Sequence, residues 1–235
     1  MTRNIVIKFG GSLLFSEGGT LNNEKVSEFC NIVKQNKDYN SIVVVCGGGS
    51  IARQYINAIR GFTENEVLCD LIGIDISRIN SRLIIAKMKG LAYPQVPKSF
   101  AELSIAVNSH KIVIMGGLQP GQSTTSVAIT VAEYLKAEKL VILTDVDGIY
   151  DKDPKLYRDA NLLERISYDS LQKLILETSI GTQSSAGEYR IFDAVSLQIL
   201  KRSGIKVFVM SGKKLKQFNK LWNNENEVIG TFISK

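Results

Sequence analysis

Three glycine-rich turns each follow a short apolar run, and their repetition is the feature of the sequence that most suggests chemistry. Gly10 and Gly11 follow IVIKF, GGG at 47–49 follows IVVVC, and GG at 116–117 follows IVIM. Glycine lets backbone N–H groups approach phosphate oxygens, and a helix that begins after such a turn adds partial positive charge. Ligands of open α/β sheets bind beyond the carboxyl ends of the strands. Several such turns at one edge therefore predict a polyphosphate ligand.

A polar loop, LQPGQST at 118–124, follows the third turn and opens a helical pattern. Ser123 and Thr124 are residue types that cap helix N-termini. Their hydroxyl groups are equally suited to hold a phosphate beside the first amides of that helix. The sequence leaves both roles open.

Charged residues at the ends of apolar runs fit the same chemistry. Lys8 ends the first run, where a lysine beside a buried strand needs an anion to neutralise it. Asp145 lies two residues after the run at 140–143, and such a carboxylate can orient a lysine or help to position the magnesium that accompanies a nucleotide. Phosphoryl transfer needs mainly positioning and positive charge, which Lys8, Arg53 and backbone amides would supply. A phosphate acceptor is already an anion, so no general base is required.

Two familiar nucleotide motifs do not explain these turns. The sequence contains no GxxxxGK[ST] run, which a P-loop requires. A GxGxxA pattern does occur at Gly47, Gly49 and Ala52, with Asp70 about 20 residues further on. Asp70, however, falls inside a helical pattern and not at the end of a second strand. A dinucleotide-dependent dehydrogenase is therefore disfavoured.

The cysteines and the single histidine suggest no metal or nucleophilic chemistry. Cys30, Cys46 and Cys69 are odd in number, widely spaced and set among apolar neighbours, so we expect core thiols. His110 stands at the polar entry to an apolar run and is expected at the surface. A histidine-based dyad or zinc site is not predicted.

Short apolar, β-branched runs alternate with longer stretches of helical periodicity. The predicted strands are 5–9, 42–46, 112–115, 140–143 and 207–210, and the predicted helices include 24–33, 51–59, 67–88, 126–135 and 195–200. Alternation of this kind is typical of an α/β fold with a parallel sheet. No linker or internal repeat divides the chain, so we expect one domain.

Composition places the chain among ordinary globular proteins. Its 235 residues are 44% hydrophobic and carry a formal net charge of +6. No stretch approaches the roughly 20 apolar residues that a membrane span needs, and no signal peptide is expected. The basic residues are scattered except at 211–220, which fits a solvated helix face. We therefore expect no membrane and no nucleic-acid partner.

Six motifs follow one another along the chain: KFGGS, GGGSIARQY, DLIGIDISRINS, MGGLQPGQST, TDVDGIYDKDP and AGEYRIFDAVSLQILKRSGIKVFVM. By these motifs the chain resembles the amino acid kinase family and, within it, the archaeal-type uridylate kinases. The resemblance runs in order from the first strand to about Met210.

The resemblance implies a three-layer αβα sandwich with a mainly parallel central sheet of about eight strands. It implies transfer of the ATP γ-phosphoryl group to UMP in pyrimidine nucleotide biosynthesis, with Mg²⁺, in a cytoplasmic homohexamer. One domain would span 1–235, with an acceptor-binding lobe at roughly 1–135 and an ATP-binding lobe at roughly 136–235.

The family's binding residues carry over onto matching positions of this sequence. The catalytic residues would be Lys8, Asp145 and Arg53. The residues implied for ATP are Gly10, Gly11, Ser12, Gly49, Arg53, Thr144, Asp145, Tyr150 and Asp153. The residues implied for UMP are Gly48, Asp70, Leu118, Gln119, Pro120, Gly121, Gln122, Ser123 and Thr124.

One position departs from part of the family. Some amino acid kinases use a second catalytic lysine late in the chain, where this sequence has Phe192 followed by Asp193. The candidates for a second cation are then Arg53, Lys152 and Arg190. Arg78, two helical turns after Asp70, is expected to pair with Asp75 or meet another subunit, with contact to the UMP phosphate as the alternative.

Two other functions remain as alternatives. The first is a kinase of the same fold for another acceptor, such as isopentenyl phosphate. The isopentenyl phosphate kinases place a histidine shortly after the GGG turn, where this sequence has Ile51, Ala52 and Arg53. The second is a nucleotide-binding protein without catalysis, which loss of Lys8 or Asp145 would have favoured.

Overall fold

Buried, β-branched runs form the centre of one sheet, as the sequence pattern predicts. The computed structural model describes residues 3–16, 18–152, 154, 156–178, 191–222 and 227–235. In it, β1 (Asn4–Phe9) pairs in parallel with β2 (Ser41–Cys46) on one side and with β4 (Lys139–Thr144) on the other. β3 (Ile112–Met115) extends the sheet beyond β2, and β6 (Val207–Ser211) extends it beyond β4, both in parallel. All five predicted strands are confirmed.

Two short strands complete the sheet beyond β6. The order is β3-β2-β1-β4-β6-β7-β5, with β7 (Thr231–Ser234) antiparallel to β6 and β5 (Arg165–Ser167) parallel to β7. The described chain thus has a mainly parallel sheet of seven strands, which confirms the α/β class. The expected strands did not include β5 and β7, because their sequences, RIS and TFIS, mix polar with apolar residues. The equally short β3, IVIM, is a continuous apolar run and was predicted.

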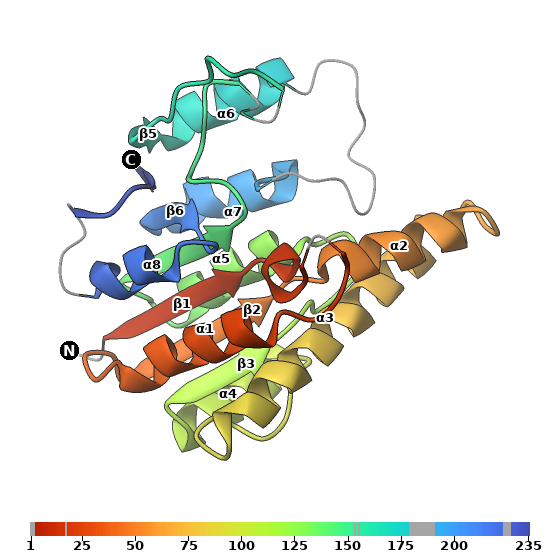
Figure 1. Cartoon of the computed structure of the whole chain (residues 1–235), viewed down its shortest axis with the longest axis vertical. Coiled ribbons are helices and arrows are strands. Elements are labelled where there is room, and N and C mark those ends of the chain that lie inside the picture. The colour runs from red at the N-terminus through yellow and green to blue at the C-terminus, as the bar shows by residue number, and fades with distance from the viewer. Residues whose placement is uncertain (1–2, 17, 153, 155, 179–190, 223–226) are drawn as a thin grey trace.

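Helices cover both faces of the sheet, so the molecule has three layers (Figure 1). The helices are η1 (Gly11–Leu14), α1 (Asn23–Gln35), α2 (Gly49–Arg60), α3 (Glu66–Met88), α4 (Phe100–Ser109), α5 (Thr124–Tyr134), α6 (Tyr168–Thr178), α7 (Ala194–Ser203) and α8 (Leu215–Leu221). Each helix predicted above coincides with one of these helices, and the predicted and observed ends differ by at most three residues. α2 and α3 run together away from the sheet as a long pair (Figure 1).

Alternate residues of β1 serve two separate cores. Ile5, Ile7 and Phe9 pack with α1, α8 and the end of α3, whereas Val6 packs with α4, α5 and α7. Lys8 shares the face of Val6, because side chains of a strand alternate. It therefore places an amine at the strand end on the side that α5 covers.

The lysine-rich stretch at 211–220 behaves as expected. Lys213, Lys216 and Lys220 are exposed, while Leu215 and Phe218 on the other face of α8 are buried in the first core. Among the described residues, no helix combines the length and apolar character needed to cross a membrane.

The first two glycine turns pack directly against each other at the end of β1. A Cβ atom on Gly11 would lie 2.2 Å from the Gly49 nitrogen and 2.6 Å from the Gly47 carbonyl oxygen. Gly49 has a φ of +73°, which side chains other than glycine rarely adopt. Both contacts are with backbone, which cannot rotate away, so only glycine fits.

We predict that Gly11→Ala lowers the free energy of unfolding by about 3 kcal/mol, because the added methyl forces the two turns apart. Urea unfolding followed by circular dichroism measures the change. Gly18→Ala is the matched control, since its nearest neighbour would lie 4.0 Å away. Similar midpoints for both variants would show that the turns are not packed as described.

Candidate functional site

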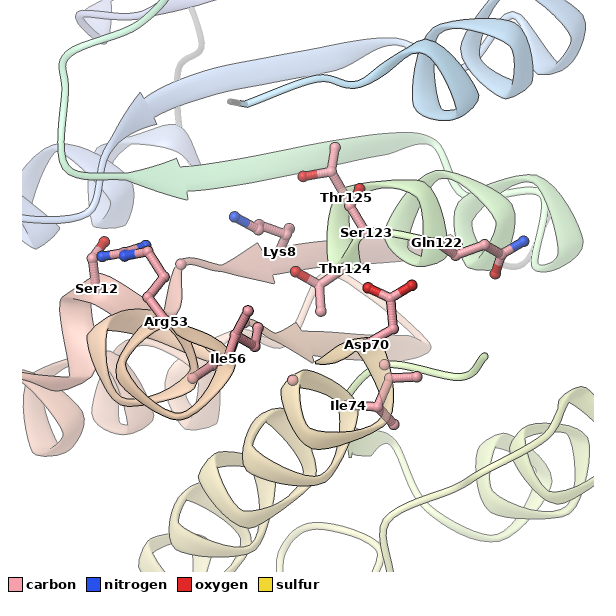
Figure 2. Close-up of a pocket in the computed structure, with 18 of the residues that line it drawn as sticks. Lys8, Ser12, Arg53, Ile56, Asp70, Ile74, Gln122, Ser123, Thr124 and Thr125 are labelled. Atoms are coloured by element: carbon pink, nitrogen blue, oxygen red, sulfur yellow. The ribbon is translucent and has the colours of Figure 1, made fainter. Parts of the chain in front are cut away.

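A pocket opens where β1, β2 and β4 end, with the three glycine turns in its wall (Figure 2). Its lining also includes the starts of α2 and α5 and the first half of α3. The residues that line it are Lys8, Gly10, Gly11, Ser12, Gly47, Gly48, Gly49, Ala52, Arg53, Ile56, Asp70, Gly73, Ile74, Gly117, Gln122, Ser123, Thr124, Thr125 and Thr144. The predicted convergence of the glycine turns at one sheet edge is confirmed.

Two helix starts in this pocket have no side-chain cap. α1, α3, α4, α5 and α7 each begin at a residue whose side chain accepts a hydrogen bond from the first turn. η1 and α2 begin after Gly10 and Gly48, and no side chain caps them. The first N–H groups of a helix have no partner within the helix. These two starts therefore offer N–H groups to an anion in the pocket.

Two cations line the same pocket. Figure 2 draws Arg53 near Ser12 at one end, with Lys8 next along the cavity. Burial lowers the pKa of Lys8 to about 8, the nearby Asp145 carboxylate opposes that shift, and the positive charge of Arg53 adds to it. Two cations that repel each other across a pocket favour an anion between them.

Asp145 follows β4 and acts on Lys8 through its charge. The Thr144 hydroxyl donates a hydrogen bond to Asp145 Oδ1 at 3.3 Å. Asp145 itself does not line the pocket, whereas Thr144 does. Part of this carboxylate's effect is thus to keep Lys8 charged.

The opposite end of the pocket is built around Asp70, on the first half of α3. Asp70 Oδ2 accepts a 2.8 Å hydrogen bond from the backbone N–H of Gly121, which has a φ of +77°. Gln122, Ser123 and Thr124 lie beside Asp70 in Figure 2. This hydrogen bond fixes the middle of the 118–124 loop to α3.

Ser123 takes the capping role that the sequence left open. Its Oγ accepts a 3.1 Å hydrogen bond from Ser126 N at the start of α5. Thr124 and Thr125 follow it in the pocket lining. Thr125 also lines the pocket and was missed by the sequence reasoning; its position two residues after a capping serine was the available signal.

Arg78 forms one of the contacts expected for it. Its Nη1 lies 3.7 Å from Asp75 Oδ1, and its guanidinium also donates to the carbonyls of Gly117 and Leu118 at 3.1 and 3.2 Å. The carbonyl contacts were not foreseen. Arg78 therefore secures the start of the 118–124 loop.

Several predicted site residues lie outside the pocket lining. Leu118, Gln119, Pro120 and Gly121 form the loop whose later residues line the pocket, and Tyr150 is half-buried in a bridge to Leu162. Asp153 falls outside the described residues.

Only one of the three candidates for a second cation lines the pocket in the described chain. Lys152 forms an exposed pair with Asp159 at 2.5 Å, and Arg190 lies outside the described residues. Arg53 is the candidate that the described residues place in the pocket lining. Phe192 is buried in the second core, and Asp193 caps α7 through Ser196 N at 2.6 Å.

Pocket residues that the sequence reasoning missed are mostly small or apolar. Ala52, Ile56, Gly73 and Ile74 come from the faces of α2 and α3 that meet each other. Their periodicity fits a core position equally well. Only the structure separates the two roles.

The cysteines and the histidine lie where the sequence predicts, in the core and at the surface. All three cysteines are buried and free, and burial raises the pKa of the Cys30 thiol to about 11 and that of Cys46 to about 12. His110 ends α4, is partly exposed and packs edge-on against Tyr93. Within the described residues, no cluster of three histidine, cysteine or acidic residues could hold a metal ion.

A doubly covered parallel sheet with cations and uncapped helix starts at its carboxyl edge defines the class of α/β proteins that bind phosphorylated ligands. The sequence model of the amino acid kinase family matches residues 3–211. The chain belongs to the amino acid kinase family.

Relatives that are named uridylate kinases match this chain over most of its length and of their own. The chain is 38% identical to a uridylate kinase of Methanobrevibacter smithii, over 98% of this chain and 99% of that one. It is 43% identical to a uridylate kinase of Sulfolobus acidocaldarius, over 82% and 83%. The crystal structure of uridylate kinase from Archaeoglobus fulgidus superimposes with a TM-score of 0.80 at 31% identity, covering 98% of this chain and 99% of that one.

Lys8 makes stability depend on pH. Its pKa is about 8 in the folded chain against an ordinary 10.5, so the unfolded chain binds more protons between these values. The unfolding free energy of the wild type should therefore rise with pH across this window. We predict that Lys8→Met is more stable than the wild type by up to about 3 kcal/mol below pH 8. The difference should shrink towards pH 10.5.

Urea midpoints of both proteins from pH 6.5 to 10.5 measure this difference. Lys216→Met, which changes an exposed lysine of α8, is the control and should show no such trend. A constant gap between wild type and Lys8→Met would mean that Lys8 is not desolvated.

Proposed function

We propose that this protein transfers the γ-phosphoryl group of ATP to UMP, giving UDP and ADP. The observation that carries the proposal is one pocket with uncapped helix starts and two cations at one end and Asp70 with a helix-opening loop at the other. The relatives named as uridylate kinases match across nearly the whole chain, which supports the choice of acceptor.

The donor side would use the turns after β1 and β2. The N–H groups of Gly11, Ser12 and Gly49 would receive the ATP phosphates, because these helix starts have no side-chain partner. Gly10, whose own N–H donates to the Leu143 carbonyl, would line the site beside them. The rest of the ATP site would be formed by Arg53, Thr144, Asp145, Tyr150 and Asp153.

The acceptor side would use α3 and the loop fixed to it. Asp70 has a second carboxylate oxygen besides the one that accepts from Gly121, and a ribose hydroxyl is a suitable donor to it. The remainder of the UMP site would be formed by Gly48, Leu118, Gln119, Pro120, Gly121, Gln122, Ser123 and Thr124.

In the reaction, a phosphate oxygen of UMP forms a bond to the γ-phosphorus while the bond from that phosphorus to the bridging oxygen of ADP breaks. Charge spreads over the migrating phosphoryl oxygens. Lys8 and Arg53 would stabilise that charge, and Asp145 would favour the protonated form of Lys8 that this requires. Since the acceptor is an anion, no side chain has to remove a proton.

Mg²⁺ would enter with ATP as part of the substrate. Proteins hold this ion through one or two carboxylates and the nucleotide's own phosphates. Asp145, at the end of β4 beside the pocket, fits that requirement, and the Thr144 hydroxyl that donates to it fixes its orientation.

The chain would form two lobes within one domain, and the pocket would lie between them, with the turns after β1 and β2 contributing to the ATP site. We propose an acceptor lobe at roughly 1–135 and an ATP lobe at roughly 136–235. We further propose a cytoplasmic homohexamer. Exposed apolar side chains on α2 and α3, such as Tyr55, Leu71 and Ile79, offer surface for subunit contacts.

The alternative acceptors have less support. Ile51, Ala52 and Arg53 occupy the positions where isopentenyl phosphate kinases have a histidine. A binding protein without catalysis would not need a desolvated lysine whose charge costs stability, yet Lys8 is present and half-buried in the pocket lining.

We predict turnover of UMP and no comparable turnover of isopentenyl phosphate or carbamate when the purified protein is given ATP and Mg²⁺. Formation of ADP, coupled to NADH oxidation, measures each rate, and CMP and dUMP are tested in parallel. Preference for another acceptor would leave the ATP site standing and overturn the acceptor site. Silence with every acceptor would favour the binding protein.

Asp70→Ala should raise the KM for UMP about 10- to 100-fold, the equivalent of losing one hydrogen bond to a charged group. The KM for ATP should stay within about threefold. Steady-state kinetics with each substrate varied in turn measure both values. Asp38→Ala is the control, because Asp38 is an exposed aspartate that lies outside this pocket. Equal losses for both substrates in Asp70→Ala would contradict the site assignment.

A further inference from the structure

Asn80 lies on α3 behind the second glycine turn and has no place in the pocket lining. Its side chain is buried, with 4% of the residue exposed. The amide nitrogen Nδ2 donates to two carbonyl oxygens of the turn, that of Gly47 at 2.8 Å and that of Gly48 at 3.2 Å. Because both partners are acceptors only, the amide must present its NH₂ group to them.

These two bonds fix the orientation of two successive peptide units. In a trans peptide the C=O and the following N–H point in opposite directions. Holding the Gly47 and Gly48 carbonyls toward Asn80 therefore directs the N–H groups of Gly48 and Gly49 away from Asn80. Those N–H groups belong to the cap and first residue of α2, which no side chain caps.

The turn packs closely against Gly11, but its glycines leave the direction of each peptide unit to be set by hydrogen bonds. Gly49 has a φ of +73°, and glycine residues have the widest choice of backbone conformations. The Gly47 N–H is used by the Phe9 carbonyl at 3.0 Å, which fixes only the first edge of the turn. The two hydrogen bonds from Asn80 fix the peptide units that follow.

Neighbouring residues of α3 act on other targets. Ser77 Oγ accepts from Gly117 N at 2.8 Å, so it fixes the third glycine turn. Ser81 Oγ donates to the Ser77 carbonyl at 2.8 Å, a bond that stays within the helix. Asn80 is thus the side chain of this segment that contacts the second turn.

We propose that Asn80 is a positioning residue that orients the Gly47–Gly49 backbone so that its free N–H groups meet phosphate oxygens of the substrates. The inference rests on the proposed function only for the identity of those substrates. Orienting the turn in this way requires the two N–H donors of the Asn80 amide, so a side chain of the same volume without them would not replace it.

The test compares Asn80→Asp, Asn80→Ala and Ser81→Ala with the wild type. Asn80→Asp keeps the shape but presents a carboxylate to two carbonyls, whereas Asn80→Ala removes the group. Ser81→Ala is the matched control, because the buried hydroxyl that it removes contacts the Ser77 carbonyl and the Cys46 thiol of β2, and not the carbonyls of Gly47 and Gly48. ATP binding is measured by calorimetry without acceptor, UMP kinase kinetics are measured separately, and urea midpoints report stability.

We expect ATP affinity to fall at least about tenfold in both Asn80 variants, with Asp no better than Ala, and to stay within about twofold in Ser81→Ala. ATP affinity close to that of the wild type in folded Asn80→Ala would overturn the proposal. So would restored affinity in Asn80→Asp, which would indicate a packing role.

If Asn80→Asp does not fold, Asn80→Ser replaces it, since its hydroxyl is too short to reach both carbonyls and should bind ATP as weakly as Asn80→Ala. Wild-type protein that binds ATP but does not phosphorylate UMP would refute the proposed function and leave this test intact. Wild-type protein that does not bind ATP would overturn both.

Discussion

The close approach of two glycine turns at the end of β1 is the constraint on which the rest of the site depends. A Cβ on Gly11 would lie 2.2 Å from the Gly49 nitrogen, so the backbones touch with no room for a side chain. This contact brings the starts of η1 and α2 together without a capping side chain on either. Loop 118–124 and Lys8 then complete a pocket around the groups that these turns leave free.

The electrostatics of the pocket oppose stability and favour binding. Burial and Arg53 lower the Lys8 pKa to about 8, and Asp145 offsets only part of that effect. Polar side chains of α3 do the opposite, because Ser77, Arg78 and Asn80 each satisfy backbone groups of a loop or turn. The charged groups of the site therefore lower the stability of the fold, whereas side chains of α3 stabilise the backbone of the loops and turns around the pocket.

Much of the fold, and the glycine turns that line the pocket, could be predicted from the sequence. Buried parallel strands are short β-branched runs, so their positions were readable, as were the glycine turns that end them. The strands β5 and β7 could not be predicted, because each is short and contains polar residues, so neither forms an apolar run like that of β3. The contacts of Asn80 were also beyond reach, since an asparagine inside an apolar helical pattern does not reveal which distant carbonyls it meets. The ligand-binding roles of all the candidate site residues, Tyr150 and Asp145 included, stay predictions.

The strand order has a consequence for how the pocket comes into being. β1 pairs with β4, whose first partner residue, Lys139, lies far along the chain from Ile5. Closing so long a loop is entropically costly, and contacts of this kind are made late in folding. During synthesis, β1 and β2 can pair while one edge of β1 stays open until residues 139–144 emerge. The Gly10 N–H finds its partner, the Leu143 carbonyl, only then. A ribosome-bound chain stopped before β4 would thus have the glycine turns without a finished pocket.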